Sequence, residues 1–407
     1  MSNYSNFSRT DKPGHGNARI ILLVALVAII VIFLCGSVFR ARADNGTESD
    51  NSTAEIIGVL DEDALNALLA SLDEKAQAIF GGDFIGVLGD IVSGKVSIDY
   101  SSFFAYLLSL VGTSLEGVMW LLVTIISVSV LYSVIGGMKS KFSSETVSKT
   151  VHIASMISII TVVAATTYSM IESCRDMVLA MTNQMTVLFP IIFSLMAAMG
   201  ASTTASVYQP ALSLIASGIM ELISSVFIPM ILFAFVFMTV GSVSGQMKLT
   251  KMSDFILSAV KWMIGMAFFL LCAFLSIQGI TASVFDSISI RTAKMTVGKY
   301  LPVIGNYLSE GINLILSGSV IVKNALGYTA IILLILSILP VVVNLIIYSL
   351  VLKLAAAITE PLGDEMMSKF LSKVSGIVSI LIAITLGAAF IYFIFILLIV
   401  MTGNISV

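Results

Sequence analysis

The side chains of this sequence that could do chemistry are sparse, and their spacing forms no catalytic or metal-binding pattern. The two histidines, His15 and His152, lie far apart, and the three cysteines stand singly in or beside apolar stretches. No Cys-x-x-Cys, His-Glu-x-x-His or phosphate-loop motif accompanies them. Asp364 and Glu365 are adjacent, so on a helix they would not face one another as an acid–base pair must. We therefore expect no enzyme, no cofactor, no metal site and no nucleic-acid partner.

Polar residues within or beside apolar stretches are the remaining candidates, because such groups are costly in a bilayer and mark functional positions there. For Glu221, at the start of an apolar run, an interfacial carboxylate and a pore-lining role are both open. For Asn344, inside another run, hydrogen bonding between helices is the alternative to a substrate contact. The candidate conduit or packing residues are Pro190, Gly200, Glu221, Lys299, Pro302, Gly305, Lys323, Asn324 and Asn344.

A second group of candidates is the segment Glu360-Pro361-Leu362-Gly363-Asp364. Its proline and glycine are residues that end helices, and its two carboxylates would be concentrated at one place on the surface. The segment is predicted to be a structural turn at the cytoplasmic face, or a contact site, with Glu360, Pro361, Gly363 and Asp364 as its candidate residues.

Membrane helices must position these residues. The chain of 407 residues is 58% hydrophobic and 11% charged, whereas soluble proteins are roughly 25% charged. We predict an all-α, polytopic membrane protein with about six spanning helices and two re-entrant hairpins, since only helices satisfy the backbone of such segments in lipid. The predicted spans are Val118–Gly137, Val151–Met170, Leu222–Gly241, Trp262–Thr281, Tyr328–Val351 and Ile377–Met401.

The N-terminal residues have the layout of a signal peptide. Basic residues precede the apolar run Ile20–Cys35, and Ala41-Arg42-Ala43 follows it with the small-x-small pattern of a cleavage site. The run is shorter than the roughly 20 residues that cross a bilayer, and an uncleaved anchor is the alternative. We therefore predict a signal peptide over residues 1–43, an acidic extracytoplasmic helical region with an interfacial helix over 44–117, and a polytopic membrane domain over 118–407.

Lysines predict the orientation of the chain. The connections 138–150, 242–261 and 352–376 are rich in lysine, and the positive-inside rule places them in the cytoplasm. Residues 185–221 must then begin and end outside. We predict a re-entrant hairpin there, interrupted at Pro190 and Pro210; a hairpin that crosses twice is the alternative. A comparable hairpin over 300–327 would complete an internal repeat, although the basic segment 285–300 would then lie outside.

Close helix packing is predicted where small residues cluster. Gly136-Gly137 and Gly387-Ala388-Ala389 allow helix backbones to approach each other, as small residues commonly do in membrane proteins. Self-association into a homo-oligomer is an extension of this pattern that the sequence leaves open.

Several motifs, none of them catalytic, occur in a characteristic order after about residue 100. They include the segment Phe142–Lys149 and the stretch from Leu188 to Gly200, and three further motifs are Gly298-Lys299-Tyr300-Leu301-Pro302-Val303-Ile304-Gly305, Lys323-Asn324-Ala325-Leu326-Gly327 and Glu360-Pro361-Leu362-Gly363-Asp364. By these motifs the chain resembles the stage III sporulation protein AE family of endospore-forming Firmicutes.

The resemblance implies a protein of the mother-cell membrane that surrounds the forespore. It implies a channel-like or secretion-like complex with the other membrane proteins of the same operon and a forespore membrane partner, and insertion by a membrane insertase of the YidC type. Within that complex a conduit-forming or permease-like role is the leading interpretation. A non-conducting scaffold for ring-forming partners and an independent ion-coupled transporter are the alternatives.

Overall fold

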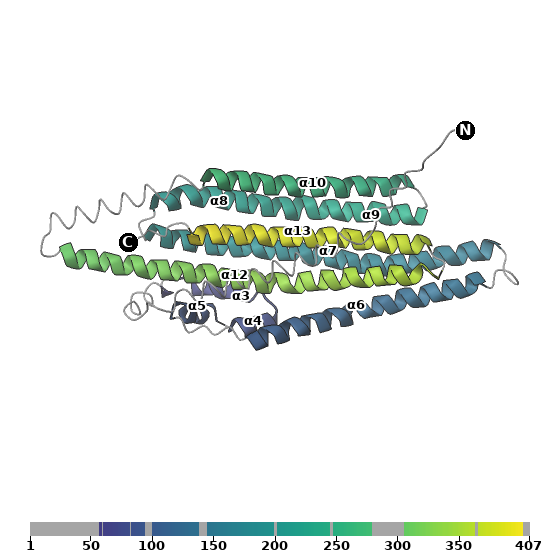
Figure 1. The fold of residues 1–407 in the computed structure, drawn as a ribbon, viewed down its shortest axis with the longest axis horizontal. Helices are drawn as coiled ribbons and strands as arrows, with labels where there is room; N and C mark the ends of the chain where they lie inside the picture. The colour runs from purple at the N-terminus through teal and green to yellow at the C-terminus, as the bar shows by residue number, and fades with distance from the viewer. Residues whose placement is uncertain are drawn as a thin grey trace, which may run out of the picture. The chain divides into compact units, whose positions relative to one another are not determined.

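The computed structural model describes residues 57–58, 60–81, 83–93, 100–137, 145–198, 202–244, 247–278, 305–362 and 365–401. All of them belong to one compact unit, residues 47–407. Every regular element among the described residues is a helix (Figure 1), which confirms the all-α prediction. The predicted cleavage residues Ala41 and Ala43 lie outside the described residues, as do Gly200, Lys299, Pro302, Gly363 and Asp364.

Three short helices precede the long ones: α3 (Glu62–Leu69), α4 (Glu74–Phe80) and α5 (Phe84–Val92). Each follows an aspartate whose side chain accepts hydrogen bonds from backbone N–H groups of the first turn: Asp61, Asp73 and Asp83. Such N-caps satisfy donors that have no partner within the helix. The helices bury leucine and phenylalanine side chains, and α5 and α4 contact the long helices α12 and α6.

The long helices are α6 (Tyr100–Gly137), α7 (Glu145–Ala198), α8 (Ser202–Leu222), α9 (Ile228–Ser244), α10 (Met247–Gln278), α12 (Gly305–Thr359) and α13 (Glu365–Met401). A π-helical turn, η2 (Ile223–Phe227), joins α8 to α9. Six helical stretches in the described part of the chain are long and apolar enough to cross a membrane, with α8 to α9 counted as one. The described parts of the six predicted spans fall one in each, so the predicted polytopic architecture is confirmed.

Pro190 and Pro210 were predicted to interrupt the helices, but they do not. Pro190 lies inside α7 and Pro210 inside α8, so residues 185–198 continue one spanning helix and residues 202–221 lead into the next. A proline within a helix removes one backbone hydrogen bond, at about 3 kcal/mol. Burial of neighbours such as Phe189 and Phe193 opposes that cost. The arms of the predicted first hairpin are therefore extensions of two spanning helices.

The predicted second hairpin is wrong for residues 305–327. These residues form the first part of α12, which runs without a break to Thr359. Gly305, Gly311 and Gly318 lie in this helix, because a glycine within a helix costs only about 1 kcal/mol relative to alanine. The predicted internal repeat requires a hairpin before the span in each half of the chain. Among the described residues this order is not present.

The bundle is organised around α7, α12 and α13. The helices α12 and α13 form an antiparallel pair, and α7 lies beside both of them, parallel to α13 (Figure 1). Side chains at their contact are fully buried, including those of Val163, Leu345 and Leu381. The ends of α6, α9 and α12 that lead into the three lysine-rich connections lie at the same end of the bundle (Figure 1), as the predicted topology requires.

Candidate functional site

Polar side chains line the contact between α7, α12 and α13, and we call this set the buried seam. Its members are Thr167, Cys174, Gln184, Lys323, Ser337, Tyr348, Ser349, Ser375 and Thr385. At one level the hydroxyls of Thr167 and Tyr348 are 2.8 Å apart, and the Tyr348 hydroxyl also donates to the Val163 carbonyl oxygen at 3.2 Å. Both side chains are fully buried.

Further hydrogen bonds connect the same three helices. Gln184 Nε2 donates to Ser337 Oγ at 2.8 Å, and the hydroxyls of Ser349 and Ser375 are 3.0 Å apart. Thr385 Oγ1 donates to Cys174 Sγ at 3.6 Å. Because lipid offers no competing partners for these groups, such bonds favour one register between neighbouring helices. The hydrogen bonds of the buried seam therefore stabilise the bundle.

Lys323 belongs to the buried seam and acts as a cap for α13. Its side chain is fully buried, and Nζ donates to the carbonyl oxygen of Val400 at 3.0 Å, one residue before α13 ends. A cation at this position satisfies a terminal carbonyl and stabilises the negative end of the helix dipole. Of the two roles that the sequence left open for Lys323, packing or conduit, the geometry supports packing.

The helices α12 and α13 approach each other closely beside this lysine. A Cβ atom added at Gly327 would overlap the Val400 side chain, so only glycine fits there. Asn324 is also buried, and its Oδ1 has no hydrogen-bond partner among the described residues.

The other predicted candidates are scattered. Glu221 is exposed near the end of α8 and accepts a hydrogen bond from Ser225 Oγ. Asn344 is half-buried in α12, Gly305 begins α12, and Pro190 is exposed on α7. Glu360 and Pro361 are exposed in a turn between α12 and α13, as predicted for that segment. The structure does not bring these residues together into one site.

A polar surface that the sequence analysis missed runs along α7 on the side away from the buried seam. We call it the outer face of α7. Its members are exposed and recur at intervals of three and four residues, which places them on one side of a helix. They are Thr161, Ala165, Tyr168, Ser169, Glu172, Arg175, Asp176, Leu179, Asn183, Thr186 and Pro190. Leu179 is the one large aliphatic side chain among them.

The charged part of the outer face lies at the depth of the hydrocarbon core. Cys174, next to Arg175, contacts Thr385 of α13. Thr385 is roughly 18 Å along α13 from Lys373 and roughly 24 Å from Met401. The sequence has no charged residue between those two positions. Wherever a hydrocarbon core about 30 Å thick is placed on this uncharged stretch, the level of Thr385 falls inside it.

The outward surface of α6 is of the opposite kind. Large apolar side chains are exposed along it, with exposed fractions of 68% for Phe104, 54% for Trp120 and 58% for Val123. Such a surface suits lipid tails. On the outer face of α7, by contrast, no described residue forms an ion pair with Glu172, Arg175 or Asp176. A charged side chain at the bilayer centre costs about 2.5–3.5 kcal/mol even on the more lenient scales, so this surface suits water or another protein.

The sequence did contain a signal for the outer face. The predicted span ended at Met170, so Glu172, Arg175 and Asp176 lay beyond it. Once α7 is continuous from 145 to 198, these charges fall in the middle of a helix instead of beyond its end. The error in helix length therefore concealed the site.

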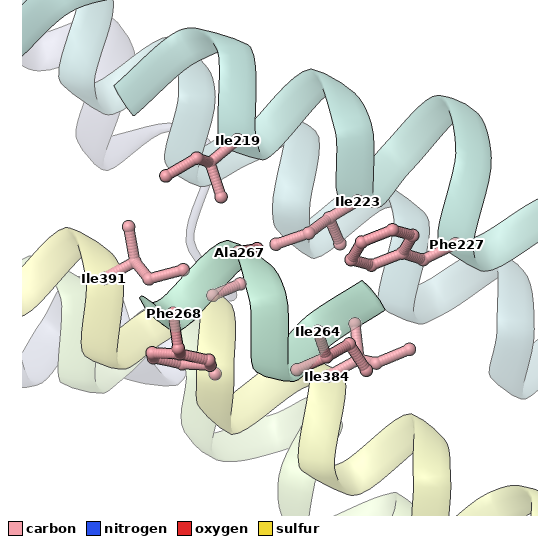
Figure 2. A pocket seen from close by; sticks show the side chains of 10 residues that line it. Ile219, Ile223, Phe227, Ile264, Ala267, Phe268, Ile384 and Ile391 are labelled. Carbon is pink, nitrogen blue, oxygen red and sulfur yellow. The ribbon is translucent and has the colours of Figure 1, made fainter. Parts of the chain in front are cut away.

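A pocket between α8, α10 and α13 is small and apolar (Figure 2). Its lining includes Ile219, Phe227, Phe268 and Ile384, and its volume is about 10 Å³. That is about the minimum space for a single water, and no polar group is there to hold one. The pocket is therefore a packing defect of the bundle and offers neither a ligand site nor a path. No cluster of metal ligands occurs among the described residues.

The described residues contain six helical stretches that are long and apolar enough to span a membrane. Together with the hydrogen-bonded buried seam and the charged outer face of α7, they define a polytopic α-helical membrane protein. Residues 83–403 match the family model described as stage III sporulation protein AE, and the chain belongs to this family. It is 22% identical over 389 residues to stage III sporulation protein AE of Bacillus subtilis (strain 168), covering 94% of this chain and 98% of that protein. No solved structure matches the chain. The resemblance noted in the sequence is thereby confirmed.

Proposed function

We propose that this protein is the conduit-forming or permease-like component of a complex that joins the mother cell to the forespore. It would lie in the mother-cell membrane around the forespore and act with the other membrane proteins of its operon and a forespore membrane partner. A YidC-type insertase would place it in the membrane. The family supports a sporulation role, and the observation that carries the conduit role is the outer face of α7.

The polar side chains of the outer face of α7 need water or a partner beside them. Charged and hydroxyl side chains at hydrocarbon depth are stable when they face a wet cavity or a protein partner. The polar groups of the buried seam bond to one another across the helices, so the path is proposed outside the single chain, along the outer face of α7. The polar side chains of that face would form hydrogen bonds that replace part of the hydration shell of solutes passing along it.

The scaffold function is the second candidate, and the closed packing of the chain favours it. If this protein only anchors ring-forming partners, a partner would cover the outer face of α7 and exclude water from it. The two functions therefore differ in whether that face is wet within the assembled complex.

Cysteine accessibility distinguishes them. In a chain whose own cysteines are replaced, Thr161→Cys, Asn183→Cys and Thr186→Cys are introduced singly and treated in sporulating cells with a membrane-impermeant methanethiosulfonate. The matched controls are Val123→Cys on α6 and Phe269→Cys on α10, which expose apolar surface. The conduit function predicts labelling on α7, little on the controls, and reduced late forespore gene expression after labelling. An unlabelled α7 in an assembled, active complex would reject the conduit and favour the scaffold.

A further inference from the structure

We infer that the outer face of α7 is covered by a second copy of this chain, with Arg175 of one copy paired to Asp176 of the other. The inference rests on the proposed function and identifies the molecule that completes the wet path. Its basis is that opposite charges lie on opposite edges of one face, at one depth.

The helix geometry separates the three charges. Successive residues are about 100° apart around the axis of an α-helix. Relative to Glu172, Arg175 therefore lies about 60° to one side and Asp176 about 40° to the other. Because the two residues are consecutive, they differ in height by only about 1.5 Å. The outer face thus has a positive edge, a negative edge and a carboxylate between them.

Membrane insertion makes this arrangement self-complementary. Copies of one chain enter the bilayer in the same orientation, so any symmetry axis that relates them runs along the membrane normal and equivalent residues share a depth. When two copies related by such an axis turn the same face toward it, the positive edge of one meets the negative edge of the other. Arg175 then reaches Asp176 of its neighbour without any shift along the axis.

The surroundings favour this partner over a different protein. No described residue forms an ion pair with either side chain, and low-dielectric surroundings penalise unpaired charges strongly. A second copy supplies both missing partners at the required depth. Glu172 remains toward the axis, where the carboxylates of the copies approach each other. Water between them would reduce their mutual repulsion, which agrees with a conduit there.

Disulfide trapping tests the arrangement. Tyr168 and Ser169 lie on opposite edges of the outer face, about two turns before Arg175 and Asp176 and on the sides of Arg175 and Asp176 respectively. Tyr168→Cys and Ser169→Cys are placed in separate, differently tagged, otherwise cysteine-free chains that are expressed together in sporulating cells and oxidised. Cross-links that join the two tags are expected, with at least fivefold lower yield when either variant is expressed alone. Trp262→Cys, exposed on α10, is the control and should not cross-link.

Charge exchange tests the pairing itself. Arg175→Asp, or Asp176→Arg, should lower the yield of mixed cross-links at least fivefold because like charges would meet. The double variant, with both changes in one chain, should restore the yield because the two edges are again complementary. Protein levels in the membrane, compared by immunoblot, separate loss of contact from loss of folding, and Arg175→Gln gives a milder version of the test.

The outcomes separate this inference from the proposed function. Absent cross-links, or a double variant no better than the single ones, would overturn the contact between copies, and labelling of α7 would then still judge the conduit. Mixed cross-links with an outer face that no reagent reaches would support the contact and reject the conduit. Cross-links together with labelling support both.

Discussion

The polar groups on the two sides of α7 differ in their burial and in their contacts with other helices. On the inner side Thr167, Cys174 and Gln184 are buried and bonded to α12 or α13. On the outer face Glu172, Arg175 and Asp176 are exposed at the same depth. Hydrogen bonds between helices are sufficient to explain why the buried polar residues of the inner side are present. Nothing within the described chain explains the outer set, and this difference identifies it as the surface that acts outside the chain.

A carboxylate placed on each side of α7 in turn tests the difference between the two sides and should give the largest effect. Met181 is fully buried, whereas Leu179, two residues earlier, is exposed on the outer face. Met181→Asp should lower the free energy of unfolding by about 3–5 kcal/mol because it leaves an unpaired charge in the interior. Leu179→Asp should change it by less than about 1 kcal/mol because that position is already polar in its surroundings.

The measurement is the free energy of unfolding of the purified protein in detergent micelles, together with the amount of protein inserted in the membrane. Val123→Asp on the apolar surface of α6 is the control for lipid contact and should reduce insertion. If Leu179→Asp reduced insertion as much as Val123→Asp, the outer face of α7 would contact lipid, and the comparison would fail.

The cap on α13 gives the next largest effect. Lys323→Ala removes a charged hydrogen bond to the Val400 carbonyl and leaves a cavity, so the free energy of unfolding should fall by about 2–3 kcal/mol. Lys323→Met keeps most of the volume and should recover the packing part of that loss. A conduit role for Lys323 predicts instead a chain of normal stability that fails to support late forespore gene expression, which a sporulation assay would reveal.

Apolar runs and lysine-rich connections were enough to predict the six spanning stretches among the described residues and their relative directions. They failed on helix length, because Pro190 and Pro210 were weighed as local breaks whereas burial of neighbours such as Phe189 keeps α7 continuous. Tertiary packing overrides local preference in this way wherever a long apolar face is available.

The candidate site was harder to predict than the fold. Lys323 and Asn324 stood out as polar residues in an apolar run, but only the contact with Val400 shows that Lys323 caps a helix 77 residues away in sequence. The outer face of α7 could have been found from its interval of three and four residues if the helix had been extended past Met170. The depth of its charges could not, because that depends on the contact between Cys174 and Thr385.

Close approach of α12 and α13 supports the inner side of the comparison and should show in a smaller effect. Gly327→Ala introduces a Cβ atom into the Val400 side chain, and overpacking of this kind should lower the free energy of unfolding by about 1–2 kcal/mol. Adding Val400→Ala should restore part of the loss, since it removes the overlapping methyl group. Gly218→Ala is the control, because a Cβ there meets no atom within 4 Å. A Gly327→Ala chain as stable as the control would mean that the helices are less closely packed.

The smallest effect is expected for two tyrosine hydroxyls, one of which contacts the inner side of α7 while the other lies on its outer face. Tyr348→Phe removes the hydroxyl that bonds Thr167 and the Val163 carbonyl, and should cost about 1 kcal/mol because both groups then stay buried without this partner. Tyr168 lies on the outer face and is 51% exposed. Tyr168→Phe should therefore change the free energy of unfolding by less than about 0.5 kcal/mol. The same pair is then compared for late forespore gene expression. Equal stability losses would show that α7 has no distinct inner and outer sides at this level, whereas the expected difference would place the stabilising hydrogen bonds on the inner side alone.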